Sequence, residues 1–274
     1  MLFRSNCDPG ETPCNCPTDC APPGPPPAPT VDPSGINKSR FISLVPGNAG
    51  QCTAIRVTLS SLHHVVPPYT AGASVPFTAF EGQNRWAGPA TQFIESASSG
   101  VPFVASNLIC TPYYQDWSTI GLLHLTGSAI VPSSVYQVAM LGAACQGTES
   151  SCSAVSNSLQ LLTNRWGDVV EPFSSPPAGG QPNFGDIGAL VNKFKSLLGA
   201  PIKARAKMAA GDARGLINIT PNVGFGDISA DVDAFKGLPY PYKPGKCTGN
   251  EAKACAADAD CVVQGTTGPC VLCP

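Results

Sequence analysis

The chain is poor in the residues on which nucleic-acid-binding proteins and many enzymes depend. Only 12% of its 274 residues are charged, the net charge is −2, and three residues are histidines. A net charge of this size argues against nucleic acid as the main partner, because phosphate binding depends on concentrated Lys and Arg. The chain also has no run of about twenty apolar residues, so we predict no membrane span.

Motifs for catalysis are missing as well. The sequence contains no G-x-S-x-G, no nucleotide-binding glycine loop and no H-E-x-x-H. His63 and His64 are neighbours at the end of an expected strand and so point to opposite faces, and His124 lies in another strand, so we assign all three structural or surface roles. Glu81 and Asp116 are the candidates for a glycosidase pair. We predict a protein without catalytic activity, with a hydrolase built on these two acids as the weakest alternative.

Proline, glycine and cysteine are abundant instead. The sequence holds 29 Pro, 28 Gly and 13 Cys, and most of the cysteines lie near its two ends. Cysteine clusters in Pro- and Gly-rich surroundings indicate disulfide bonds and hence an oxidising, extracellular compartment. Zinc is the alternative for Cys270 and Cys273, which form a C-x-x-C, but no second pair and no neighbouring His completes a four-ligand site.

Composition divides the chain into six segments. Residues 1–20 hold four cysteines and are similar to a small cysteine-rich motif of bacterial surface proteins, here cut short. Because Met1–Ser5 is too short for a signal peptide, we expect a secreted or cell-surface protein whose gene is truncated upstream. The other segments are a Pro-rich linker (21–35), a β region (36–173), a second linker (174–182), a helical repeat (183–243) and a cysteine-rich tail (244–274).

The β region carries short β-branched runs broken by Gly and Pro. Runs at this spacing, without helices between them, predict a mainly β fold with a β-sandwich. Around Tyr136, the segment Ile130–Val138 resembles the tyrosine corner of fibronectin type III and immunoglobulin-like domains, in which the Tyr hydroxyl bonds back to the chain leading into its strand. The resemblance implies a sandwich of that type. The expected strands are Arg40–Val45, Cys52–Leu62, Val75–Phe80, Phe93–Ser96, Val101–Cys110, Ile120–Leu125, Val135–Leu141 and Ser158–Thr163.

Two disulfides are expected within this β region. Cys145 and Cys152 flank the loop that follows the strand of Tyr136 and are near enough in the chain for a local bridge. Cys52 and Cys110 are then the natural remaining pair, although the sequence alone does not fix their connectivity.

A cluster of aromatic residues is the candidate ligand-binding site. Tyr113, Tyr114 and Trp117 lie together in a loop before an expected strand. Sugar rings stack on exposed aromatic faces, whereas Trp and Tyr in a sandwich usually pack in the core or cover an edge. An exposed patch of rings here favours glycan binding, and burial of the rings excludes it.

Two segments 41 residues apart repeat almost the same pattern. In NFGDIGALVNKFK, Asn183–Lys195, and GFGDISADVDAFK, Gly224–Lys236, a Phe-Gly-Asp triplet opens an amphipathic helix. Asp186 and Asp227 lie where a carboxylate accepts hydrogen bonds from the free amides at a helix start. We expect the two helices to bury their apolar faces against each other. In the first helix this face consists of Ile187, Leu190, Val191, Phe194, Leu197 and Leu198.

The pairing of a loop that ends in Asp with a following helix resembles a dockerin module, a duplicated half EF-hand of secreted bacterial proteins. The resemblance implies calcium in each loop and docking to a cohesin partner. Such a loop needs oxygen ligands at several fixed positions, the last of which is position 12. With Asp227 at that position, only Asn218 and Asp227 are good ligands, and the first repeat has no usable set. We therefore expect a degenerate calcium loop, no other cofactor, and Asp186 and Asp227 acting mainly as helix caps.

Together these features predict a non-catalytic structural or adhesion protein outside the cell or on its surface. We expect it to contribute to a matrix, envelope or filament through its β-sandwich and dockerin-like module, with another protein or further copies of itself as partner. Because calcium ligands are few, we expect the helix pair to cap the sandwich, fastened by Leu238–Pro244. The alternative is a carbohydrate-binding module linked to extracellular polysaccharide degradation, with a glycan as partner.

Overall fold

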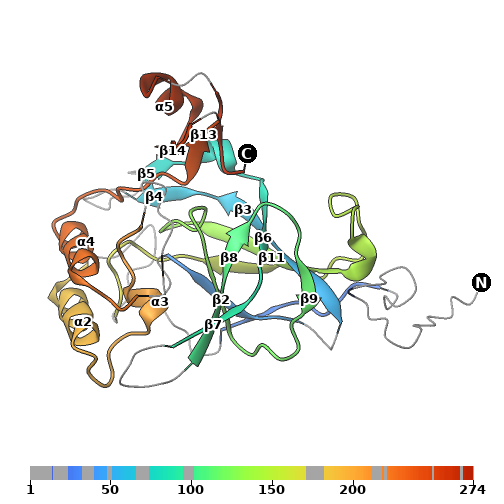
Figure 1. The fold of residues 1–274 in the computed structure, drawn as a ribbon, viewed down its shortest axis with the longest axis horizontal. Coiled ribbons are helices and arrows are strands. Elements are labelled where there is room, and N and C mark those ends of the chain that lie inside the picture. Colours follow the sequence, from blue (N-terminus) through green and yellow to red (C-terminus); the bar gives the residue numbers. More distant parts are fainter. Residues whose placement is uncertain are drawn as a thin grey trace, which may run out of the picture.

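One strongly curved sheet of ten strands forms the centre of the molecule (Figure 1). The computed structural model describes residues 14, 24–32, 40–47, 51–65, 74–94, 102–170, 182–211, 218, 221–248, 250–265 and 268–273. The two end strands of the sheet, β1 (Thr30–Val31) and β12 (Leu159–Leu162), contact each other, so the sheet is nearly closed into a barrel. The chain is therefore mainly β, as the sequence predicts.

The main path of the sheet starts at β1 and ends at β12. In hydrogen-bonded order, the strands between them are β2 (Ile42–Val45), β10 (Leu123–Thr126), β8 (Pro102–Ile109), β6 (Asn84–Ala87), β3 (Cys52–Ser61) and β11 (Val135–Gly142). Two shorter strands lie beside this path: β7 (Thr91–Ile94) pairs with β8, and β9 (Tyr114–Asp116) pairs with β3. Among these strands only β8 and β10 are parallel neighbours.

Alternating apolar residues turn one face of the strands into the barrel core. In β3, Ile55, Val57 and Leu59 are fully buried, whereas Arg56 and Thr58 between them are partly exposed. Such alternation is the pattern from which strands are predicted, and each of the eight expected runs overlaps a strand. The run Val75–Phe80 divides into β5 (Ser74–Pro76), which pairs with β4 (His63–Val65), and a short helical turn, η1 (Thr78–Phe80). The sequence did not predict four of the strands up to β12: β1, β4, β6 and β9.

The hydroxyl of Tyr136 makes the contacts that its sequence context predicts. Tyr136 is fully buried on β11, accepts a hydrogen bond from the Val131 amide (2.8 Å) and donates one to the Ala129 carbonyl (3.1 Å). The ring is thereby tied to the chain that leads into its own strand. The wider fibronectin- or immunoglobulin-like arrangement stays a prediction.

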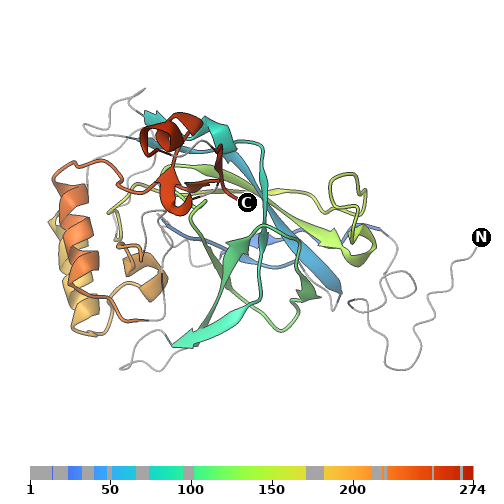
Figure 2. The ribbon, with the colours of Figure 1, turned by 45° about the horizontal axis from the view of Figure 1, so that its top comes forward.

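Two helices of eleven residues each lie side by side at one end of the barrel (Figures 1 and 2). They are α2 (Phe184–Phe194) and α4 (Phe225–Phe235), and a short helix, α3 (Lys203–Ala206), occurs between them in the chain. Their buried residues belong to the same hydrophobic cluster as the barrel core, and include Ala189, Leu190, Ala230 and Ala234. The helix pair therefore packs on the barrel as a cap.

The C-terminal residues form a small unit with its own disulfides. Strands β13 (Gly245–Cys247), β14 (Asn250–Cys255) and β15 (Cys270–Val271) pair into one sheet beside helix α5 (Asp258–Val263). Two disulfides, Cys247–Cys261 and Cys255–Cys270, hold this unit together. Because Cys270 and Cys273 belong to different disulfides, the zinc alternative for their C-x-x-C does not apply.

Three further disulfides involve the barrel, and one expected pairing is wrong. Cys145, at the end of the turn η2 (Ala143–Cys145), pairs with Cys152 as predicted. Cys52 pairs with Cys14, and Cys110 pairs with Cys273, so the expected Cys52–Cys110 bridge is replaced by two others.

The unpredicted strand β6 explains this error. It lies between β3, which begins at Cys52, and β8, which ends just before Cys110. Strands two places apart in a sheet are roughly 10 Å from each other, whereas a disulfide needs Cα atoms within about 7 Å. All ten cysteines in the described residues are in disulfides, which fits an oxidising compartment. No helix in the described part of the chain combines the length and the apolar composition that crossing a bilayer requires.

Candidate functional site

The ring contacts between the two helices of the cap follow the 41-residue repeat of the sequence. Phe184 at the start of α2 meets Phe235 at the end of α4, with ring centroids 4.6 Å apart, so the helices are antiparallel. Phe194 at the end of α2 meets Phe225 at the start of α4 at 4.9 Å. Adding 41 to either residue of α2 gives its counterpart in α4. The pair therefore has an approximate two-fold symmetry.

Asp186 fastens α2 to the loop that follows β12. Its Oδ2 accepts a hydrogen bond from the amide of Asn183 (2.9 Å), the residue that caps the helix. Its Oδ1 accepts from the amides of Val169 (2.8 Å) and Val170 (2.9 Å). The carboxylate is fully buried, so it satisfies amides that water does not reach. The role of a helix cap, predicted from sequence, is thus extended to a contact between two distant segments.

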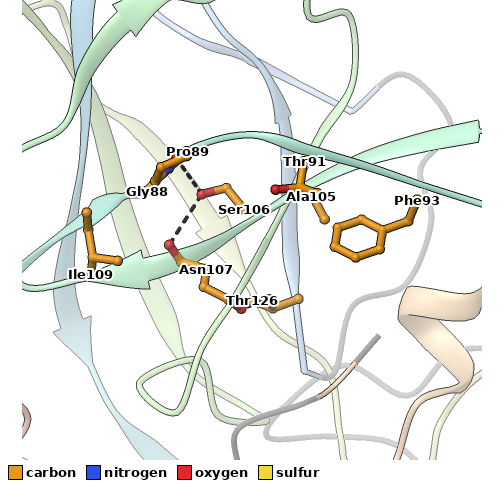
Figure 3. Close-up of a pocket in the computed structure, with 9 residues that line it drawn as sticks. All are labelled: Gly88, Pro89, Thr91, Phe93, Ala105, Ser106, Asn107, Ile109 and Thr126. Atoms are coloured by element: carbon orange, nitrogen blue, oxygen red, sulfur yellow. Dashed lines mark hydrogen bonds between the residues drawn. The ribbon is translucent and has the colours of Figure 1, made fainter. Parts of the chain in front are cut away.

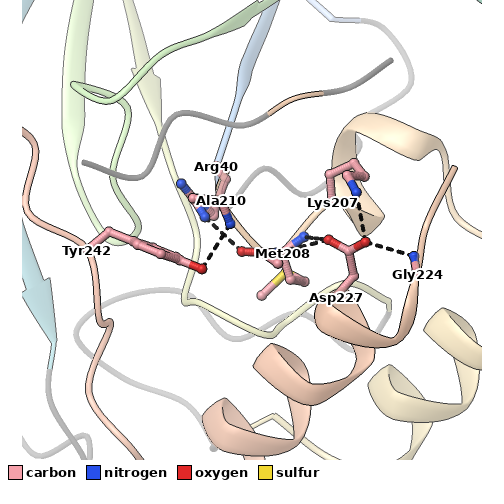
Figure 4. A network of polar contacts seen from close by, with 8 residues as sticks. Arg40, Lys207, Met208, Ala210, Gly224, Asp227 and Tyr242 are labelled. Atoms are coloured by element: carbon pink, nitrogen blue, oxygen red, sulfur yellow. Dashed lines mark hydrogen bonds and ion pairs between the residues drawn. The ribbon is translucent and has the colours of Figure 1, made fainter. Parts of the chain in front are cut away.

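Asp227 makes the same contacts in the second repeat and one more (Figure 4). Its Oδ2 accepts from the amide of Gly224 (2.9 Å), and its Oδ1 accepts from the amides of Met208 and Ala209 (both 2.9 Å). In addition, the Nζ of Lys207 lies 2.8 Å from Oδ2, and both charged side chains are buried. The repeat therefore includes the segment that precedes each helix as well as the helix itself.

These contacts leave little room for calcium at the predicted loop. The carboxylate of Asp227 accepts four hydrogen bonds, which uses the sites that its two oxygens offer. A cation there would also have to displace the ammonium of Lys207. Asn218 is exposed. With these bonds in place Asp227 has no oxygen site left for a calcium ion, and the calcium loop of Asn218 and Asp227 stays a prediction.

The outer side of the helix pair is apolar and exposed. Phe184 and Phe225 are each 76% exposed, and Leu198 is 97% exposed. The sequence predicted a buried face that included Phe194, Leu197 and Leu198, which is wrong. Leu190, which the prediction also included, is fully buried, and it shares the face turned to the barrel with Asp186 and Ala189. We call the exposed residues the apolar strip: Phe184, Phe194, Leu197, Leu198, Phe225 and Leu238.

Two buried positions differ between the two helices, with Lys193 of α2 replaced by Ala234 of α4 and Leu190 replaced by Asp231. Leu190 of α2 is fully buried, and 41 residues later Asp231 of α4 is fully buried as well. Neither carboxylate oxygen of Asp231 has a hydrogen-bond partner in the described part of the chain. Burial, followed by repulsion from Asp186 and Asp168, raises the pKa of Asp231 to about 8. The carboxyl group is therefore mostly protonated at neutral pH.

The segment after α4 fastens the cap to the barrel, as the sequence predicts. Tyr240 is buried and its ring meets the edges of Trp166 (5.8 Å) and Tyr242 (5.3 Å). The guanidinium of Arg40 lies over both tyrosine rings, 5.3 and 4.7 Å from their centroids. Arg40 also donates to the carbonyl of Met208 (2.7 Å), so this segment, the barrel and the second repeat share one network (Figure 4).

The predicted aromatic binding site does not form an exposed platform. Trp117 is fully buried and its indole N–H donates to the carbonyl of Thr53 (2.8 Å). Tyr113 and Tyr114 are half-buried, and the hydroxyl of Tyr114 donates to Glu149 (3.2 Å). Trp117 therefore has no free face on which a sugar ring could stack, while Tyr113 and Tyr114 are partly exposed.

The candidate catalytic acids lie at opposite ends of one strand. Asp116 is paired with Cys52, the first residue of β3, whereas the carboxylate of Glu81 accepts from the amide of Leu62, just beyond the last residue of β3. Ten residues of strand span roughly 30 Å, and a glycosidase pair needs carboxyl groups within about 10 Å. His124 is buried between the rings of Phe41 and Phe103, in a structural position.

A surface pocket on the barrel was not anticipated from the sequence. It lies over β8 where the chain passes from β6 to β7, and has a volume of about 270 Å³ (Figure 3). The residues that line it come from three strands and one connection, so no continuous sequence motif predicts the pocket. By contrast, the exposure of Phe184 and Phe225 had a local signal, because both lie on the side of the helix opposite to Ala189 and Ala230 when residues are placed at 100° intervals.

Comparison with models of known protein families, with curated proteins and with solved structures finds no match to this chain. Function is therefore inferred from three features of the molecule. These are the disulfides, the helix pair with its apolar strip, and the pocket on β8.

Proposed function

We propose that the protein is a non-catalytic structural protein of an extracellular assembly, and that it associates with further copies of itself through the apolar strip. The observation that carries this proposal is the exposure of two equivalent phenylalanines, Phe184 and Phe225, on a helix pair whose opposite face is already buried on the barrel. Large apolar patches on a protein surface mark interaction sites, whereas single exposed apolar residues do not.

The strip is large enough for a stable contact between two copies. With about 200 Å² for a fully exposed side chain of this size, its six residues expose on the order of 800 Å². Each partner in a standard interface buries about 800 Å². Covering the strip alone thus approaches the area that a specific dimer needs.

The approximate two-fold symmetry of the strip favours a second copy as its occupant. One end of the strip has Phe184 and Leu238 beside the half-buried Phe235, and the other end has their equivalents Phe225 and Leu197 beside Phe194. An isologous interface brings the same patch of both subunits together. Two helix pairs packed face to face would bury both ends of both strips in a four-helix arrangement.

The remaining features support an extracellular role. Five disulfides among the described residues are typical of secreted proteins. The hydrogen bonds of Tyr136 support a relation to fibronectin-like sandwiches, and the repeated helix start supports a relation to dockerin modules. In the proposed role the helix pair works without calcium.

Sedimentation equilibrium of the full chain over a range of concentrations tests the proposal. We expect a reversible dimer, and we expect the double variant Phe184→Ser, Phe225→Ser to be monomeric. The matched control is Leu162→Ser, Val262→Ser, which removes two apolar side chains that are 56% and 70% exposed outside the strip. This control should dimerise like the wild type.

Two outcomes would contradict the proposal. A wild-type chain that stays monomeric at the highest concentration would leave docking to a different protein as the role of the strip. A dimer that survives in the Phe184→Ser, Phe225→Ser variant would place the interface elsewhere. Because both serines replace side chains that are 76% exposed, the variant should fold, which its near-ultraviolet circular dichroism spectrum checks.

A further inference from the structure

The pocket on β8 forms because three residues of the connection between β6 and β7 lie opposite only two residues of β8. Ala87 of β6 is paired with Leu108, and Thr91 of β7 is paired with Ala105, so residues 88–90 face only residues 106 and 107. Pro89 in this bulge has no amide to donate to β8. The extra residue lifts the chain away from the sheet and opens the pocket (Figure 3).

Hydrogen bonds hold the bulge in one conformation. The amide of Gly88 donates to the carbonyl of Asn107 (3.0 Å), and the hydroxyl of Ser106 donates to the carbonyl of Gly88 (2.7 Å). A side chain on Gly88 would come within 3.1 Å of the Asn107 carbonyl and of Ile109. The floor of the pocket is therefore formed in advance of any ligand.

The polar groups of the pocket are neutral and oriented. Asn107 is exposed, and its Oδ1 accepts a hydrogen bond from the hydroxyl of buried Thr126 (2.7 Å), which fixes the amide plane. The Nδ2 of Asn107 then offers two N–H donors to the pocket. Thr91, on the opposite strand, adds an exposed hydroxyl. None of the residues that line the pocket is charged.

Apolar side chains flank this polar floor at its two ends. The ring of Phe93 is half-buried and stacked on Phe103 at 5.6 Å, so its orientation is fixed by packing. Ile109 lies at the other end of the pocket (Figure 3). A ligand that fits must present an apolar face to Phe93 and hydrogen-bonding groups to Asn107 and Thr91.

We propose that this pocket binds a neutral sugar ring. A pyranose has an apolar face of C–H groups, which stacks on an aromatic ring, and an edge of hydroxyl groups, which accept from an amide and exchange hydrogen bonds with a threonine. The uncharged lining disfavours acidic sugars and phosphates, which require Lys or Arg to offset their desolvation. A volume of about 270 Å³ is at the lower end for ligand pockets, which fits a single ring of a glycan chain. The site is separate from the apolar strip, so the two proposals stand independently.

The test is a saturation-transfer NMR screen of the full chain against methyl pyranosides and short neutral oligosaccharides, followed by titration calorimetry of those that bind. We expect a neutral sugar to bind at millimolar concentration and glucuronate and inorganic phosphate to bind more weakly. Asn107→Asp removes both N–H donors while keeping the acceptor for Thr126, and Phe93→Ala removes the stacking ring. Each should weaken binding about tenfold or more, the equivalent of about 1.4 kcal/mol.

Tyr113→Ala is the matched control, because it removes a half-buried aromatic ring outside the pocket and should leave the affinity unchanged. Folding of each variant is checked by its thermal unfolding transition. The proposal is overturned if no neutral sugar gives a signal, if glucuronate or phosphate binds more tightly, or if both pocket variants bind like the wild type. Dimerisation is measured on the same samples, so failure here is distinguishable from failure of the apolar strip.

Discussion

The two repeats of the cap share one set of hydrogen bonds between an aspartate and backbone amides, and they differ in the side chains around it. In both, an aspartate three residues into the helix accepts from the capping amide and from two amides of a preceding segment. The second repeat adds the buried ion pair of Asp227 with Lys207, and it has Asp231 where the first has Leu190. The duplicated element is thus the carboxylate that joins two chain segments. The charged residues buried around it differ, because the first repeat has Lys193 where the second has Ala234.

Removing the shared carboxylate should affect the second repeat more than the first. We expect Asp227→Ala to cost about 3–5 kcal/mol of unfolding free energy, because it leaves the buried Lys207 without a counter-charge. Asp186→Ala leaves three backbone amides unsatisfied and should cost about 1–3 kcal/mol. Urea unfolding under oxidising conditions measures both. Equal losses would show that the ion pair adds nothing, and a Lys207→Met, Asp227→Ala double variant should regain part of the loss.

A single methyl group at Gly167 should disrupt the contact between the loop that follows β12 and helix α4. Gly167 has a φ of +88°, and a Cβ there would lie 2.5 Å from the Cβ of Ala234 and 2.9 Å from Pro182. We expect Gly167→Ala to cost about 2–4 kcal/mol, from backbone strain and overpacking together. Gly82→Ala is the control, because its φ is +78° with no atom within 4 Å of the added Cβ. If both variants lose the same stability, the loop does not pack tightly on α4.

The buried Asp231 should make the stability of the protein depend on pH. Its pKa is about 8 in the folded chain and ordinarily 3.8, so between these values the unfolded chain has lost a proton that the folded chain keeps. Stability then falls as the pH rises from about 4 to about 8. We expect Asp231→Asn to be more stable than the wild type at pH 8 by about 1–3 kcal/mol, since the new amide also lacks partners, and to match it near pH 4.

Chemical denaturation at several pH values measures this effect. Asp233→Asn, two residues away and only half-buried, is the matched control and should leave the slope of stability against pH unchanged. A wild-type profile that is flat between pH 5 and pH 8 would contradict the assignment. It would show that Asp231 gains a partner, such as water, that restores its ordinary ionisation.

Local patterns in the sequence predicted the elements well and their partners less well. The alternation of Ile55, Val57 and Leu59 with polar residues predicted β3, and the repeated Phe-Gly-Asp triplet predicted α2 and α4. The predicted buried face of α2 is right at Leu190 and wrong at Phe194, Leu197 and Leu198, because periodicity gives the apolar residues of a helix but does not state which neighbour covers them. The barrel covers Ala189 and Leu190, and nothing local identifies the barrel as the neighbour.

Long-range features could not be predicted because they depend on the order of strands in the sheet. β6 is short and contains Asn84 and Arg85, so it has no apolar run. Without β6, the sequence predicts that β3 and β8 are neighbours and that Cys52 pairs with Cys110. The pocket on β8 brings Phe93, Asn107 and Thr126 together from three strands. The buried pair of Asp227 with Lys207 joins residues 20 apart through a loop whose course the sequence does not specify.

Two of the disulfides determine how the molecule would respond to mechanical tension. A pull on the first residues reaches Cys14 and crosses to Cys52, and a pull on the last residues reaches Cys273 and crosses to Cys110. The stretched backbone is then limited to residues 52–110, which contain β3, β6, β7 and β8. Residues 111–272, including the helix pair and the fully buried Tyr136, lie in a covalent side loop that carries no force. Tension applied to the two ends of the chain would therefore leave the helix pair and its apolar strip unloaded.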